Sequence, residues 1–413
     1  MLTQYYPPEV GAPQGRLSDL ARRLVAAGHE VTVVTAMPSY PVGRVQEPWR
    51  GRLIGRESID GVQVLRSWIY ATPRKERVPQ LASYGSFVAS VALSAPFRIR
   101  RQDVVLWESP PLFLAPVAKL LARRTGARLV MNVSDLWPES AVDLGVLSNR
   151  RVIELFEGVE RRAYDDADLV TFQTEGIGAG VSHRAPGTRG LLYPNGVDLA
   201  HFEPRERDPD VRLRYGVPPH AFLVGYAGNF GRAQAIDQIV DAAMMLADRR
   251  DIWFLLHGSG PTRADVAERV ARDGLKRLVL AEPVPRDEVP DLLAAWDVSV
   301  VPLADAPVFD GARPSKMFEL FAMQVPFVYC GRGEGAEIAR RSGGAVVVEP
   351  QRPEELADAL RRLASLPVEE RVAMGVSARS FVEAEFDRAA IARMVEGALQ
   401  RLADGADEDE DRG

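Results

Sequence analysis

The chain has 413 residues, a formal net charge of −6 and 46% hydrophobic residues. This length is typical of two domains, and the acidic balance argues against a general nucleic-acid binder. A single cysteine, Cys330, excludes an internal disulfide and a cysteine-rich metal site, and its apolar surroundings favour an inert core position in a reducing, cytoplasmic setting. The five histidines have no metal-binding spacing, and no transmembrane run or signal peptide is expected.

Strand-like and helix-like segments alternate along the chain, which is typical of parallel sheets covered by helices. The first strand has only about three residues, whereas a buried strand normally has about five or six. Either this strand is short, or Met1 lies inside the natural reading frame. The loop at residues 5–15, with Glu9 and Gly11, follows this strand, and ligands bind at such carboxyl ends in open α/β sheets.

Residues 81–99 form a long helical candidate followed by Arg98, Arg100 and Arg101. One interpretation is a core helix with a polar cap. The other is an interfacial helix or acceptor groove whose basic residues meet anionic lipid. Pro96 is expected to kink or end the helix. In this half, strands are predicted at 31–35, 62–68, 103–108, 128–133 and 168–173, a helix at 153–166, a polar stretch at 70–79, and a glycine-rich basic loop at 177–189.

Asp135 follows the predicted strand at 128–133 and opens the loop Asp-Leu-Trp-Pro-Glu-Ser. An aspartate at the carboxyl end of a strand is a site candidate. Aspartate also favours caps and turns, so a structural role for Asp135 is equally open.

We place the linker into a second domain at residues 191–202, where Pro-Asn-Gly at 194–196 is a strong turn signal, and the alternation of strands and helices restarts after it. A glycine-rich turn at 228–232 follows the strand predicted at 222–227, and glycines allow the backbone to approach a phosphate closely. Two glycines in a turn are a weak signal alone. Strands are also predicted at 252–257, 277–281 and 297–302, and amphipathic helices at 236–246, 354–363, 368–384 and 387–402.

Residues 311–331 predict a loop, a helix and a buried strand. Pro314 suits a first helical turn, and Met317 and Leu320 belong to the stripe that faces a core. The free N–H groups at the helix start attract anions, and Lys316 adds a positive charge there. Glu319 could accept hydrogen bonds from sugar hydroxyls. The alternative is a surface helix in which Lys316 and Glu319 form a weak pair.

Several motifs in one order resemble the family 4 retaining glycosyltransferases, within them the bacterial fucosamine-type transferases of surface polysaccharides. The motifs, which span residues 4–330, are QYYPPEVGAPQGR, GHEVTVVT, SPPLF, DLWPES, YPNGVD, YAGNFGRAQ, HGSGP, VPRDEVPDLLAAWDVSVVPL and PSKMFELFAM. The resemblance implies the GT-B architecture, an α/β fold with two Rossmann-like domains and an interdomain cleft. It implies an acceptor domain at 1–190, a nucleotide-sugar domain at 191–386 and a C-terminal crossover helix at 387–402. A disordered acidic tail is expected at 403–413.

The resemblance also assigns roles to residues. Glu319 would bind the nucleotide ribose, and Ser315 and Lys316 would lie near the diphosphate. Gly11 would approach the donor phosphates, and Asp135 would lie beside the transferred sugar. The remaining donor-binding positions are the phosphate turn, with Asn229, Gly231 and Arg232, and the nucleobase surroundings, with His257, Gly258, Gly260, Val284 and Arg286.

The sequence departs from the family pattern in two places. Gly311 stands where the family has the first glutamate of the paired motif, with Asp310 adjacent. In the turn after the second domain's first strand, Asn229 takes the place of the usual arginine, and Gln234 falls near the place of the usual lysine. Arg232 or Arg313 is therefore expected to supply charge, and Lys316 and Arg232 are expected to stabilise the leaving group.

The implied activity is metal-independent, retaining transfer from an NDP-sugar, most concretely a UDP-sugar, to a hydroxyl. No cofactor beyond this donor is expected. The acceptor could be lipid-linked or soluble, and peripheral contact with the cytoplasmic face of the inner membrane fits the arginine cluster. The alternatives are an epimerase or phosphorylase of the same fold and a non-catalytic GT-B subunit.

Overall fold

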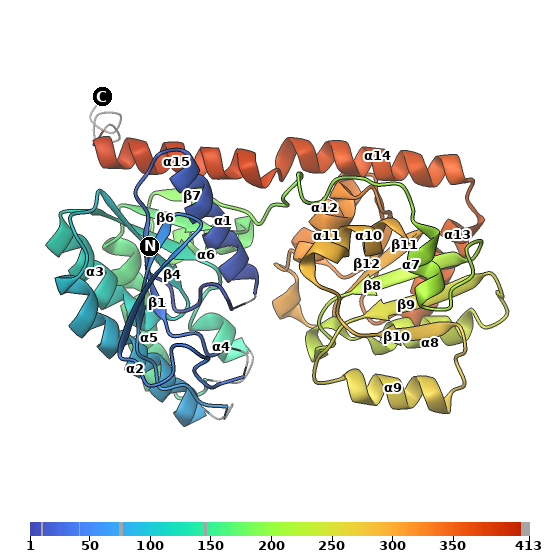
Figure 1. Cartoon of the computed structure of the whole chain (residues 1–413), viewed down its shortest axis with the longest axis horizontal. Coiled ribbons are helices and arrows are strands. Elements are labelled where there is room, and N and C mark those ends of the chain that lie inside the picture. Colours follow the sequence, from blue (N-terminus) through green and yellow to red (C-terminus); the bar gives the residue numbers. More distant parts are fainter. Residues whose placement is uncertain (10, 41, 74–76, 144–146, 406–413) are drawn as a thin grey trace. The chain divides into compact units, whose positions relative to one another are not determined.

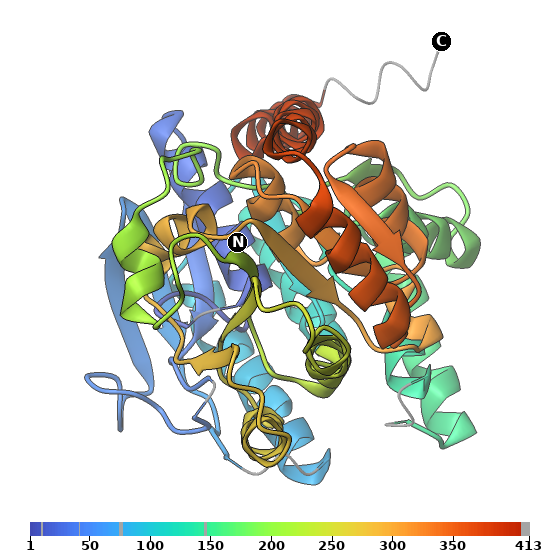
Figure 2. The same cartoon turned by 90° about the vertical axis from the view of Figure 1, so that its right-hand side faces the viewer.

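A computed structural model describes residues 1–9, 11–40, 42–73, 77–143 and 147–405. The chain forms two compact units. The first contains residues 1–194 together with the helical segment from Ala389, and the second contains Asn195–Arg388. Both are α/β units with helices on the faces of their sheets (Figure 1, Figure 2).

The sheet of the first unit has two parts, in the orders β1-β3-β2 and β4-β5-β6-β7. Leu2 joins them, because it makes parallel bridges to Val34 on one side and Trp107 on the other. The predicted first strand is thus one bridging residue. The strands are β1 (Thr32–Ala36), β2 (Ile54–Ile59), β3 (Val62–Ser67), β4 (Val104–Ser109), β5 (Arg128–Val133), β6 (Leu169–Phe172) and β7 (Gly190–Leu192).

Helices of this unit bury apolar stripes against both faces of the sheet. One core contains Phe87 and Val91 of α2, and the other contains Leu17 and Leu20 of α1. Helix α15 packs on the second core through residues such as Val395, so the chain's last described helix completes the first unit. The helices are α1 (Ala12–Ala26), α2 (Arg77–Ser94), α3 (Ala115–Thr125), α4 (Glu139–Asp143), α5 (Arg150–Asp165), α6 (Glu175–Arg184) and α15 (Arg388–Asp404).

Three sequence-based expectations change in this unit. The glycine-rich stretch 177–189 is mostly helix α6, whose start is capped by the Thr174 side chain accepting the N–H of Ile177 at 3.1 Å. The cap and the packing of Val181 outweigh the low helix propensity of glycine. Helix α2 ends at Ser94 and not at the predicted residue 99, because Pro96 ends it, which is one of the two effects expected of this proline. Helix α15 extends to Asp404, past the predicted end at 402. Residues 74–76 and 406–413, which carry parts of the predicted polar stretch and tail, lie outside the described residues.

The second unit is a six-stranded parallel sheet in the order β10-β9-β8-β11-β12-β13. Alternate residues of each strand enter two separate cores: Leu223 and Tyr329 lie in one, and Val224 and Cys330 in the other. Cys330 is fully buried, as predicted for a core position, and burial raises the pKa of its thiol. The strands are β8 (Phe222–Ala227), β9 (Ile252–His257), β10 (Leu278–Ala281), β11 (Val298–Pro302), β12 (Phe327–Cys330) and β13 (Ala345–Val348).

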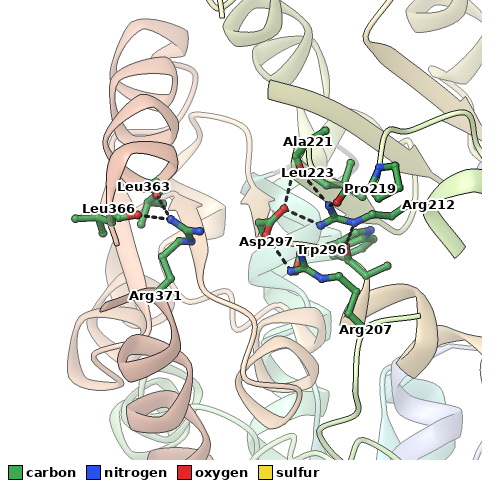
Figure 3. Close-up of polar contacts among 11 residues, drawn as sticks. Arg207, Arg212, Pro219, Ala221, Leu223, Trp296, Asp297, Leu363, Leu366 and Arg371 are labelled. Carbon is green, nitrogen blue, oxygen red and sulfur yellow. Dashed lines mark hydrogen bonds and ion pairs between the residues drawn. The ribbon is translucent and has the colours of Figure 1, made fainter. Parts of the chain in front are cut away.

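Arg212 fastens the loops at the amino ends of β8 and β11 (Figure 3). Its guanidinium, 1% exposed, donates to the Ala295 carbonyl at 2.8 Å and to the Ala221 carbonyl at 2.7 Å. It also pairs with Asp297 at 2.7 Å, and Asp297 accepts the backbone N–H of Leu223. The helices of the unit are α7 (Pro209–Arg214), α8 (Asp237–Met245), α9 (Arg263–Arg272), α10 (Val289–Ala294), α11 (Ser315–Ala322), α12 (Gly333–Arg341), α13 (Pro353–Ser365) and α14 (Val368–Glu385).

Candidate functional site

Two glycine-rich turns meet at the carboxyl ends of the neighbouring strands β8 and β9. Gly258 has a φ of 153°, and a Cβ atom there would lie 1.9 Å from the Gly228 carbonyl oxygen. Gly260 has a φ of 150°, and its Cβ would lie 2.5 Å from Asn229 Oδ1. Only glycine allows these turns to pack so closely, so the structure brings together the predicted positions at 228–231 and 258–260.

Lys316 reaches this pair of turns from the first turn of α11. Its ammonium donates a hydrogen bond to the Tyr226 hydroxyl at 3.1 Å and lies 4.3 Å from the centre of the Tyr226 ring. A Cβ atom on Gly228 would lie 2.7 Å from Lys316 Nζ. The ammonium is therefore held close to the backbone of this glycine-rich turn, and a cation beside such a turn suits a bound phosphate.

Tyr226 links the lysine to the turn. Its hydroxyl accepts from Lys316 and donates to the Asn229 carbonyl at 2.7 Å, and its ring is fully buried. This residue was not singled out from sequence, since an aromatic residue in a buried strand is normally core. Its hydroxyl becomes informative only when the fold brings α11 next to β8.

The charge of Lys316 is costly where the side chain lies. Burial lowers the pKa of Lys316 to about 8, and the nearby charge of Glu319 opposes this shift. Burial likewise raises the pKa of Glu319, which the charges of Arg286, Arg388 and Lys316 oppose. A poorly solvated cation is well suited to bind an anion, because the anion replaces the interactions with water that burial removes.

The N-terminus of α11 leaves backbone N–H groups available. Pro314 precedes its first residue, Ser315, and no side chain caps this end. Ser315 is exposed, as is Arg232 at the start of the short helix after the Gly228–Gly231 turn. The Arg232 guanidinium makes no hydrogen bond or ion pair with any residue that the structure describes, so it is available to a ligand.

The side chains of two predicted ligand-binding residues make contacts within the second unit. Arg313 is nearly buried and pairs with Glu334 of α12 through two nitrogens, both at 2.7 Å, so its side chain contributes to the structure of this unit. His257 is 1% exposed and lies with its ring 4.7 Å from that of Tyr215, because the last residue of β9 points into the core. Its Nδ1 lies 2.9 Å from the Glu282 carbonyl oxygen, and burial lowers its pKa. Only the backbone of His257 is presented to the turns.

The loop around Gly311, where the sequence departs from the family pattern, contacts α12 through its backbone. Gly311 is exposed and has open space around it, whereas the Asp310 carbonyl accepts the N–H of Glu334 at 2.8 Å. Val284 packs on the core of the unit, and the Arg286 side chain is exposed. The positive charges of Arg286 and Lys316 both lower the pKa of the Glu319 carboxyl, so both side chains lie near it.

A separate polar cluster lies at the carboxyl ends of β4 and β5 in the first unit. Glu108, 3% exposed, accepts hydrogen bonds from Asn132 and Ser134 and pairs with Arg16 at 3.1 Å. Arg16 also donates to Ser134 Oγ at 2.7 Å. Burial raises the pKa of Glu108 despite these donors. The signal for this cluster in the sequence is a glutamate near the end of an otherwise apolar strand, which alone does not predict a site.

Asp135 follows directly after Ser134 and is exposed at this edge. Its carboxyl accepts hydrogen bonds from the Ser140 side chain and from the Leu136 N–H, so it contributes to the turn that follows β5. Desolvation of the carboxyl raises its pKa, with the charge of Glu139 as a smaller contribution. Gly11 lies at the N-terminal end of α1 with an extended backbone, and a Cβ there would lie 2.3 Å from Gln14 Oε1.

Some kinds of site do not occur in the part of the chain that the structure describes. No group of three histidine, cysteine, aspartate or glutamate side chains there could hold a metal ion. No helix among those residues has the length and apolar content needed to cross a bilayer.

Comparison with known proteins gives the class. Residues 11–196 match a glycosyl transferase 4-like domain model, and residues 221–365 match the glycosyl transferases group 1 model. The chain is 27% identical over 401 residues to the colanic acid biosynthesis glycosyl transferase WcaI of Escherichia coli K12, covering 94% of this chain and 96% of that one. It is 26% identical over 219 residues to 2-deoxystreptamine glucosyltransferase of Streptomyces kanamyceticus, covering 52% and 55%.

Solved structures show the same fold. Sucrose-phosphate synthase from Thermosynechococcus elongatus superposes with a TM-score of 0.73 at 19% identity, covering 97% of this chain and 98% of that one. HepE of Anabaena, solved with UDP and glucose, superposes with a TM-score of 0.68 at 16% identity and the same coverage. The fold is thus the predicted two-domain GT-B architecture, and the chain belongs to the family 4 glycosyltransferases. These relatives do not favour the epimerase, phosphorylase or non-catalytic alternatives.

Proposed function

We propose that the second unit binds an NDP-sugar and that this donor is a UDP-sugar. Its diphosphate would lie at the two glycine-rich turns next to Lys316. The observation that carries this proposal is the lysine ammonium held 3.1 Å from the Tyr226 hydroxyl beside Gly228. Lys316 and Arg232 would neutralise the diphosphate, with N–H groups of the α11 N-terminus and the Gly228–Gly231 turn. Glu319 would accept hydrogen bonds from the ribose hydroxyls.

The chemistry we propose is retaining transfer without a metal ion. The bond between the sugar C1 and the phosphate oxygen breaks, and the acceptor oxygen attacks C1 from the same face. The leaving phosphate takes the acceptor's proton, so no protein base is required. Lys316 and Arg232 stabilise the charge that develops on this phosphate. Asp135 would lie beside the positively charged sugar centre.

We further propose that the acceptor is a hydroxyl compound of polysaccharide or glycoconjugate synthesis and binds to the first unit. The full-length similarity to a colanic acid biosynthesis enzyme supports this process. Activity that persists in EDTA, with the product's anomeric configuration read by NMR, tests metal independence and retention. Loss of activity in EDTA that added Mg²⁺ restores would refute the first, and an inverted product would refute the second.

The donor site is tested by calorimetric titration with UDP, GDP, TDP and ADP. One nucleotide should bind at micromolar affinity, and both Lys316→Ala and Glu319→Ala should weaken it. Lys276→Ala, which removes an exposed lysine of the same unit, is the matched control. Failure of all four nucleotides to bind a protein whose fold is confirmed by circular dichroism would refute the assignment.

We also propose peripheral contact with an anionic membrane, on the cytoplasmic face, through the end of α2. Leu93 and Phe97 are 77% and 72% exposed, and the exposed residues Arg98, Arg100 and Arg101 follow them. No acidic residue occurs between positions 77 and 102, which favours anionic lipid.

This face lies at the amino ends of the strands, because β4 begins at Val104. It is therefore proposed as an anchor and not as the seat of the acceptor. Phe97→Ser should reduce sedimentation with phosphatidylglycerol vesicles, and equal binding to phosphatidylcholine vesicles would contradict the charge argument.

A further inference from the structure

Exposed aromatic side chains gather at one edge of the first unit's sheet. Among the described residues, four aromatic side chains are classed as exposed: Tyr40 at 48%, Tyr70 at 46%, Trp68 at 39% and Phe97 at 72%. Three of the four follow the carboxyl ends of β1 and β3, which pair in register from Thr32 and Gln63 onward. Scattered exposed rings are ordinary on a protein surface, whereas a cluster at the carboxyl ends of parallel strands, where open α/β sheets bind ligands, indicates a binding surface.

Tyr5 adds a half-buried ring to the same edge. It follows Leu2, which pairs with Val34 of β1, so its loop leaves the sheet next to the loop that carries Tyr40. The two ring centres lie 5.8 Å apart at an interplanar angle of 64°. Tyr5 also shares a side-chain hydrogen bond with Tyr84 of α2. Tyrosines from three separate segments of the chain therefore meet here.

Glu9 holds these loops in place. Its carboxylate, 4% exposed, accepts the backbone N–H groups of Ser39 and Tyr40, both at 2.8 Å. Tyr70 is fixed in turn because its N–H donates to Ser86 Oγ of α2 at 2.8 Å. Since the backbone at Tyr40 and Tyr70 is anchored, a ligand that stacks on these rings pays little of the ordering cost that a mobile loop would add.

The chemistry of the cluster favours a sugar ring. An aromatic face is electron-rich and attracts the C–H groups on one face of a pyranose, while phenolic hydroxyls can bond to the ring's hydroxyls. Glu108, Ser134 and Asp135 lie at the same edge, after β4 and β5. We propose that Tyr5, Tyr40 and Tyr84 form a subsite that stacks a pyranose ring of the acceptor. This inference rests on the proposed glycosyl transfer and names the class of its acceptor.

Saturation-transfer NMR with methyl α-D-glucopyranoside, methyl α-D-galactopyranoside and methyl α-L-fucopyranoside tests this subsite. At least one glycoside should bind, and Tyr40→Ala should weaken its binding by about 2- to 10-fold, the effect of one aromatic contact. Phe97→Ala, which removes an exposed ring at the amino end of the sheet, should leave it unchanged. Tyr5→Phe keeps the ring and loses the hydroxyl, so it should weaken binding less than Tyr40→Ala.

Nucleotide titration of the same samples separates this inference from the proposed function. If nucleotides bind and no glycoside does, or if Tyr40→Ala binds the glycoside as well as the wild type, the subsite is refuted while the donor site stands. If phenol binds and the glycosides do not, the subsite is refuted in favour of an aromatic acceptor. Glycoside binding that depends on Tyr40, without nucleotide binding, supports the subsite and refutes the donor site.

Discussion

Replacing Lys316 by methionine should change donor affinity and stability in opposite directions. The substitution removes the charge and preserves most of the side-chain volume. A charge-assisted hydrogen bond contributes about 1.5–3 kcal/mol, so nucleotide affinity should fall by about 10- to 100-fold. The bond that disappears is the one we propose between the ammonium, held at Tyr226, and the diphosphate.

The free protein should become more stable. Burial lowers the pKa of Lys316 from 10.5 to about 8, a difference that corresponds to about 3 kcal/mol at pH 7. A contact between an ammonium and an aromatic ring offsets about 0.5–2 kcal/mol of this cost, which leaves a gain of about 1–3 kcal/mol for Lys316→Met.

The sign of the pH dependence follows from the same shift. The folded-state pKa lies below the unfolded value, so the wild type is destabilised at neutral pH and gains stability as pH rises from about 8 to 10.5. Nucleotide affinity should instead decline above about pH 8, as the ammonium loses its proton. Both dependences should be weaker in Lys316→Met.

Urea unfolding and calorimetry between pH 6.5 and about 9.5 measure both quantities across this pKa. Lys276→Met, at an exposed lysine, should alter neither. A Lys316→Met protein that binds nucleotide as tightly as the wild type would refute the placement of the diphosphate. A loss of stability at pH 7 would refute the view that the buried charge is costly.

Three further predictions concern the second unit. Arg212→Ala removes a buried guanidinium from the Ala295 and Ala221 carbonyls, leaves Asp297 paired with Arg207 alone, and should cost about 3–5 kcal/mol in urea unfolding, against less than about 1 kcal/mol for the exposed Arg205→Ala. Gly258→Ala should abolish nucleotide binding in titrations while the far-ultraviolet spectrum persists, because its Cβ would lie 1.9 Å from a backbone oxygen; unchanged affinity would contradict the close packing. Arg313→Ala should lower the melting temperature and leave nucleotide affinity within about threefold, which is below the roughly tenfold effect of a lost charge-assisted hydrogen bond; a larger loss would show that Arg313 also contacts the nucleotide.

Local patterns were sufficient to predict many of the elements. Phe222–Ala227 and Ile252–His257 are strands with the predicted bounds, since short apolar runs of this length between turn signals favour buried strands. Residues 177–189 were misassigned because glycine content is a local signal, whereas the Thr174 cap and the packing of Val181 depend on the surrounding structure. Local chemistry also placed the positively charged helix start at Lys316.

The partners of each side chain were decided only by the tertiary structure. Arg313 and Lys316 are three residues apart and carry the same charge, yet one pairs with Glu334 and the other reaches Tyr226. Likewise, Arg16 and Glu108 are 92 positions apart and meet because the sheet brings α1 beside β4. A sequence specifies residue types and short-range periodicity, whereas distance, burial and pKa arise from contacts between distant segments. The class of this protein was therefore accessible from its motifs, whereas the partners of its charged residues were not.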